Sequence, residues 1–111
     1  MAAMQSIVLD AHLSGLLGFA LKARQAATGL DAVKRGVKRK KIAFILCDST
    51  LGKNSFKKVM TIARMSEIPV FIVDATDTEN KLLHLSGYKI IGIEQGSFAQ
   101  GFLKYLRQEN K

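Results

Sequence analysis

Apolar residues recur at helical spacing along the first part of the chain: Leu9, Leu13, Leu16, Leu17, Ala20 and Leu21. This stripe predicts an amphipathic helix over residues 6–22. A second, shorter stripe predicts a helix that opens after Thr28, with Asp31 completing a capping arrangement, and ends near Arg39.

Continuous apolar runs follow and predict strands over Ile42–Cys47, Val70–Val73 and Lys89–Ile93. Helical patterns separate and follow these runs. We expect one helix from near Lys53 to before Pro69, a second from the capping box of residues 76–79 to Gly87, and a third from Ser97 to near Leu106. This alternation predicts an α/β fold, a three-layer α/β/α sandwich around a mixed sheet that we expect to have four strands. At 111 residues, the chain is expected to form a single domain over 1–111.

The positive charge is concentrated in one segment. Residues 20–65 contain twelve basic side chains and two acidic ones, a net charge of +10, whereas the whole chain carries +8. Such a segment favours polyanionic partners, and nucleic acid above all. One cysteine excludes an internal disulfide and fits a reducing cytoplasm. No signal peptide or membrane span is visible, so we expect a cytoplasmic protein that does not bind membranes.

Enzymatic chemistry has two weak candidates. Cys47 closes a predicted strand, where a nucleophile could sit, but no histidine is near it in sequence and a buried structural thiol is the better interpretation. The stretch 47–54 superficially resembles a phosphate-binding loop, yet Cys47 replaces its first glycine and Asn54 replaces the hydroxyl residue that holds magnesium. We therefore expect neither an enzyme nor a cofactor or metal site.

The basic segment and the short helix after Thr28 together favour RNA binding. Free N–H groups and the helix dipole attract phosphate at the start of that helix, and Lys34, Arg35 and Lys38 lie along it. Lys53, at another helix start, could contact a further phosphate. No DNA-binding motif is visible, which makes structured RNA the preferred ligand.

Several segments in order resemble the family of kink-turn-binding ribosomal proteins: Leu16 to Ala20, Ala27-Thr28-Gly29, Ile42 to Asp48 and Ile68-Pro69-Val70. The chain is most similar to the small bacterial YlxQ-like branch of that family, over about residues 13–106. The resemblance implies an α/β/α domain without enzymatic activity that recognises structured RNA, ribosomal RNA or another RNA with a kink-turn, in or near the ribosome.

The resemblance also implies three groups of RNA-contacting positions. A Gly-x-Asn-Glu motif at the start of the second helix corresponds to Gly29, Leu30, Asp31 and Ala32. The end of a strand corresponds to Leu46, Cys47 and Asp48, and a loop that touches an extruded base corresponds to residues 85–88, with Ser86, Gly87 and Tyr88 as the contacts.

Two of these positions depart from the family motif. An ionised Asp31 only accepts hydrogen bonds where asparagine would also donate, and Ala32 offers no acceptor in place of glutamate. We therefore predict a monomeric, non-enzymatic protein that binds structured RNA. The alternative is a protein-interaction module of ribonucleoprotein particles with only nonspecific RNA affinity.

Overall fold

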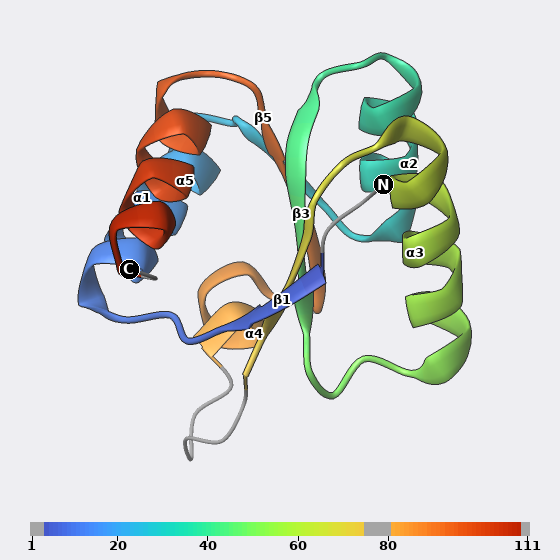
Figure 1. The fold of residues 1–111 in the computed structure, drawn as a ribbon, viewed down its shortest axis with the longest axis horizontal. Helices are drawn as coiled ribbons and strands as arrows, with labels where there is room; N and C mark the ends of the chain where they lie inside the picture. The colour runs from blue at the N-terminus through green and yellow to red at the C-terminus, as the bar shows by residue number, and fades with distance from the viewer. Residues whose placement is uncertain (1–3, 75–80, 110–111) are drawn as a thin grey trace.

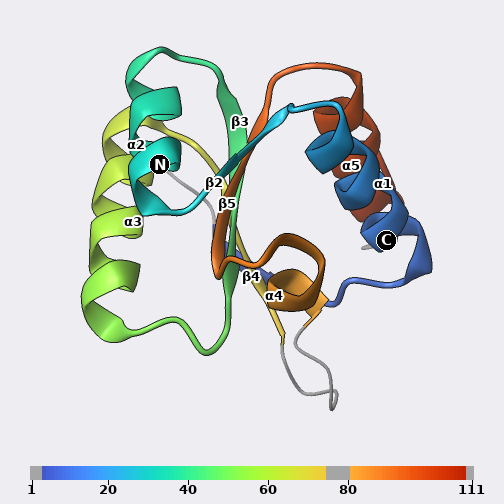
Figure 2. The ribbon, with the colours of Figure 1, turned by 180° about the vertical axis from the view of Figure 1, so that it is seen from behind.

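The structure is a computed structural model that describes residues 4–74 and 81–109. Its strands are β1 (Met4–Ile7), β2 (Ala26–Thr28), β3 (Ile42–Asp48), β4 (Val70–Val73) and β5 (Ile90–Glu94). Its helices are α1 (Ala11–Lys22), α2 (Leu30–Lys38), α3 (Lys53–Ser66), α4 (Lys81–Ser86) and α5 (Ser97–Glu109). In Figures 1 and 2 the sheet stands between α2 and α3 on one face and α1, α4 and α5 on the other. The predicted α/β arrangement with helices on both faces is present.

The sheet is mixed and has the strand order β1-β4-β3-β5-β2. β1, β4 and β3 run parallel to one another, whereas β5 is antiparallel to both β3 and β2. The parallel strands β3 and β4 are joined by a helical crossover, α3, which is the arrangement that alternating helices and strands favour.

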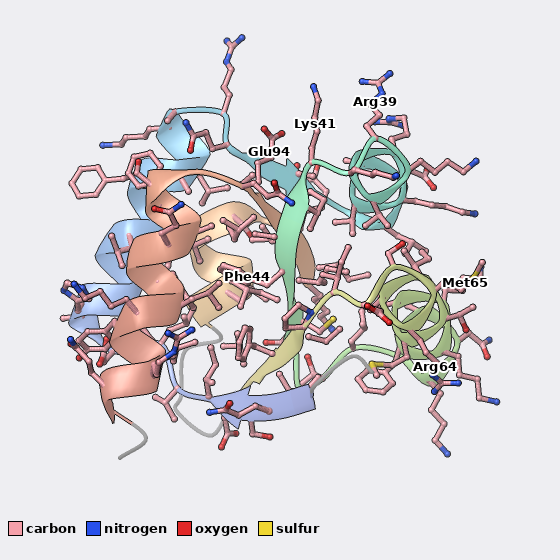
Figure 3. All side chains as sticks on the ribbon, turned by 45° about the horizontal axis from the view of Figure 1, so that its top comes forward. Arg39, Lys41, Phe44, Arg64, Met65 and Glu94 are labelled. Carbon is pink, nitrogen blue, oxygen red and sulfur yellow. The ribbon has the colours of Figure 1, made fainter. Side chains whose placement is uncertain are left out.

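Each face of the sheet has its own hydrophobic core, because successive strand residues point to opposite sides. On β3, Phe44 and Leu46 join the core under α1 and α5, while Ile45 and Cys47 join the core under α2 and α3. Figure 3 shows Phe44 between β3 and the α1/α5 layer. A continuous apolar run therefore predicted this strand correctly, since both of its faces are covered.

The prediction of four strands is wrong, because the sheet in the described residues has five. The predicted first helix, over residues 6–22, is too long at its start. Met4–Ile7 forms edge strand β1, and Asp10 caps α1, its Oδ1 accepting a hydrogen bond from the Leu13 N–H at 2.9 Å. Leu9 is buried without being helical, so its helical spacing to Leu13 is coincidental.

The start of the second helix also differs from the prediction. Thr28 is the last residue of β2 and does not cap α2; the capping position belongs to Gly29, which has no side chain to accept a bond. The predicted end of α3 before Pro69 is confirmed, with Glu67 in a left-handed conformation after the helix. The expected stop at Gly87 is confirmed as well, whereas the capping box of residues 76–79 lies outside the described residues.

Across residues 4–74 and 81–109, every helix is too short or too polar to cross a lipid bilayer.

Candidate RNA-binding site

The start of α2 lies at one end of the sheet, held there by β5. The Gly29 N–H donates to the Ile90 carbonyl at 2.9 Å, which extends the β2–β5 pairing by one residue. Gly29 then turns the chain into the helix with φ +88° and ψ 160°, a conformation that is essentially restricted to glycine. Figure 2 shows α2 starting directly beyond β2, beside β5.

The first turn of α2 has no side-chain cap. The Val33 N–H donates to the Gly29 carbonyl and begins the helical pattern, so the N–H groups of Leu30, Asp31 and Ala32 precede the first helical bond. Such groups, together with the helix dipole, favour an anionic ligand. The exposed Asp31 carboxylate beside them adds an acceptor of hydrogen bonds to the same place.

Tyr88 covers the glycine from the loop that enters β5. A Cβ atom added to Gly29 would lie 3.3 Å from Cε1 of Tyr88 and 3.4 Å from its Cδ1, so the ring and the glycine are in close contact. The Tyr88 N–H donates to Oγ of Ser86 at 3.0 Å, and that hydroxyl donates to the Leu82 carbonyl at 2.7 Å. Gly87 has φ +77° between them. The turn therefore fixes the Tyr88 backbone, while 47% of the residue stays exposed.

These elements border one open hollow of about 620 Å³, which we call the tip hollow. Its lining residues are Thr28, Gly29, Leu30, Asp31, Ala32, Arg35 and Tyr88. Six of them are predicted RNA contacts. The seventh, Ala32, was matched to the family motif but was not counted as a contact, because its side chain offers no acceptor. The hollow thus combines free helix N–H groups, a carboxylate, a guanidinium and an exposed aromatic ring.

Two predicted lysines lie elsewhere on the basic surface. Lys34 lines a hollow between α2 and α3, and Lys38 lines another at the far end of α2 with Lys40. Of the three cations of α2, only Arg35 lines the tip hollow. Lys34, Arg35 and Lys38 were expected to act together at the start of α2, but they line three separate hollows.

The end of β3 does not open into the tip hollow. Cys47 and Asp48 are 0% and 1% exposed, so neither side chain reaches solvent. Burial, with a smaller contribution from the Asp48 charge, raises the pKa of Cys47 to about 12. Near neutral pH the group is a buried thiol, which is a poor nucleophile.

In the loop after β3, the N–H groups of Ser49, Thr50 and Leu51 are bonded within the protein. The N–H of Thr50 donates to Oδ2 of Asp48 at 2.8 Å, and the Thr50 hydroxyl bonds to the same oxygen. The N–H groups of Ser49 and Leu51 donate to the carbonyls of Val73 and Asp48. Lys53 is exposed at the start of α3 and does not line the tip hollow. Within the described residues, no group of three or more His, Cys, Asp or Glu side chains is placed to hold a metal ion.

The chain has an α/β fold with a mixed five-stranded sheet, and several solved structures have a similar fold. No protein-family model matches the chain, and no curated protein matches it.

The chain is similar to a Bacillus halodurans protein of unknown function, with a TM-score of 0.73 and 25% identity over 88% of this chain and 99% of that one. It is also similar in fold to part of the Thermoplasma acidophilum Pelota protein, with a TM-score of 0.60 and 13% identity over 76% of this chain. An archaeal translation termination factor, aRF1, gives a TM-score of 0.59 and 17% identity over 78% of this chain. The chain spans only 27% and 24% of these two larger proteins.

Proposed function

We propose that this chain is a non-enzymatic protein that binds structured RNA, with a kink-turn as the preferred element, through the tip hollow. One observation carries the proposal. Tyr88 and Gly29 are 59 positions apart in sequence, yet they meet beside the uncapped first turn of α2. A ligand in this hollow meets amide donors, a carboxylate acceptor, Arg35 and an exposed aromatic face within one small volume.

Each of these groups suits folded RNA. The first-turn N–H groups and Arg35 attract backbone phosphate, and Asp31 accepts from the amino or imino group of a base edge. The exposed ring of Tyr88 offers a stacking surface for a base that has left its helix. Gly29 has no side chain, so the RNA backbone can approach the turn closely. Lys34, Lys38 and Lys53 would add long-range attraction from the surrounding surface.

The alternatives have less support. A catalytic role for Cys47 would require a reactive thiolate, and burial with a raised pKa opposes one. A nucleotide site in the stretch 47–54 would lose the N–H groups of Ser49, Thr50 and Leu51, which are already bonded within the protein. The proposed role near the ribosome agrees with the similarity in fold to aRF1, which is named a translation termination factor.

The test compares three RNAs: a kink-turn, the same RNA with its G·A pairs replaced, and a plain hairpin. We expect the kink-turn to bind more tightly than the other two in fluorescence anisotropy. Replacing Tyr88 by Ala should remove one base-stacking contact, about 1–3 kcal/mol, or roughly 5- to 150-fold in affinity.

The matched control is Phe19→Ala. Phe19 is an exposed aromatic residue (60%) on α1, in the opposite helix layer. Its removal should leave RNA affinity unchanged. Equal affinity for all three RNAs, or equal losses from Tyr88→Ala and Phe19→Ala, would contradict the proposal.

A further inference from the structure

A second, shallow hollow between α2 and α3 is lined by lysines and aliphatic side chains. It measures about 360 Å³, and its lining residues are Lys34 from α2 and Lys57, Lys58, Thr61, Ile62 and Met65 from α3. Lysine covers apolar surface with its four-carbon stem and holds its ammonium group in water. The hollow is therefore apolar in its depth and positively charged at its rim.

Met65 is the most exposed large apolar side chain of the described residues, at 81%. Figure 3 shows it on the outer side of α3, away from the sheet. It also lines the neighbouring hollow at the end of α2, together with Lys38, Lys40 and the single carboxylate there, Glu67. Met65 thus forms an apolar ridge with lysines on both sides. Methionine is frequent at protein-binding surfaces because its flexible side chain adapts to a partner.

This surface is separate from the tip hollow. Lys34 and Arg35 are consecutive residues of α2, and consecutive helical residues point about 100° apart. Arg35 lines the tip hollow, whereas Lys34 lines the hollow between α2 and α3. The two hollows therefore share no lining residue.

We propose that the α2–α3 hollow binds an acidic, amphipathic segment of a partner protein. An apolar side chain of that segment packs on Ile62 and Met65, and its carboxylates face Lys34, Lys57 and Lys58. A purely apolar partner would desolvate these ammonium groups without pairing them. RNA supplies the negative charge but has no aliphatic side chain for the exposed Met65. None of the six lining residues is acidic, so the charge of the hollow complements such a segment.

The probe is a synthetic amphipathic peptide of about 18 residues, five helical turns, with leucine on one face and glutamate on the rest. The control peptide has the same composition in scrambled order. The chain contains four methionines, so ¹³C-methyl labelling gives few signals, with Met65 the exposed reporter and Met60 a half-buried reference on the same helix. We expect the amphipathic peptide to shift the Met65 methyl signal more than that of Met60.

Affinity measurements then locate the contact. Met65→Asp should weaken peptide binding by at least about tenfold, because it removes the apolar contact and adds a repelling charge. The charge-reversed pair Lys57→Glu and Lys58→Glu should do the same. Arg35→Ala, in the tip hollow, and Phe19→Asp, at an exposed apolar site on α1, should leave peptide binding unchanged.

Three results would overturn the inference. The first is equal binding of the scrambled peptide. The second is an equal loss from Phe19→Asp and Met65→Asp. The third is displacement of the peptide by a short RNA duplex that also shifts the Met65 signal, which would make this face an RNA surface. The first two results do not depend on whether the tip hollow binds RNA, and RNA binding there is measured separately with Tyr88→Ala and Arg35→Ala.

Discussion

Replacing Gly29 by alanine tests how the entry into α2 is built. The native backbone at Gly29, with φ +88° and ψ 160°, lies in a region that alanine adopts at a cost of order 1–3 kcal/mol. The new Cβ would also lie 3.3 Å from Cε1 of Tyr88. That ring is about half exposed and can move, so we attribute most of the cost to backbone strain. We expect a loss of about 1–3 kcal/mol in the free energy of unfolding, measured by urea denaturation with circular dichroism.

Gly52→Ala is the matched control. Gly52 is likewise the capping residue of a helix, α3, but its φ is −62° and no atom lies within 4 Å of an added Cβ. Both substitutions lose the same capping preference of glycine over alanine, so their difference reports the strain. A second comparison introduces Gly29→Ala into a Tyr88→Ala background, where most of the loss should persist. Equal losses at Gly29 and Gly52 would refute the strain argument, and full recovery without the Tyr88 ring would show that the contact dominates.

Further predictions concern three other sites. Arg35→Ala should weaken RNA binding and reduce the slope of log affinity against log salt by about one, whereas Lys104→Ala, at an exposed position of α5, should change neither. Asp10→Ala should lower the free energy of unfolding by about 1–2 kcal/mol, since Asp10 caps α1 and accepts a 2.6 Å bond from the Tyr105 hydroxyl. The bond from the Leu13 N–H, followed by that from Tyr105, lowers the pKa of Asp10, so the stabilisation by Asp10 is present above the unfolded pKa and should be lost as pH falls through the folded pKa. A stability difference between the wild-type protein and Asp10→Ala that stays constant as pH falls through this range would contradict this. Cys47, whose pKa is raised to about 12, should resist iodoacetamide in the native state, and rapid labelling of the native protein would count against its burial. The contribution of Cys47 to the free energy of unfolding should decline as pH rises from about 8.5 toward 12, because only the thiol of the unfolded chain ionises in that range.

Patterns of apolar residues predicted the long helices and strands well, because these elements bury apolar side chains against the rest of the protein. The runs at β3 and β4 are buried on both faces, and α3 ends before Pro69 as expected. The edge strands were not predicted. β1 contains only four residues, two of them polar, and β2 contains three residues, two of which are alanine, a weak strand former. Both strands depend on pairing with distant neighbours, which a local pattern does not report.

The candidate site was partly predictable. The helix tip at Gly29 to Asp31 and the cations of α2 are local features of the sequence. The position of Tyr88 depends on β5 lying beside β2, a contact between distant segments, and it entered the prediction only through a family resemblance. The division of the cations between separate hollows follows from the direction of each side chain around α2, and charge counting does not resolve it.

The most direct test of the central claim is an NMR titration of the ¹⁵N-labelled chain with a kink-turn RNA. The account predicts that the amide signals of Leu30, Asp31 and Ala32, together with that of Tyr88, shift first and most strongly. Signals from the exposed side of α5 around Lys104 should not move. Shifts confined to the lysines of α3, or no shift at the start of α2, would contradict the assignment of the tip hollow as the RNA-binding site.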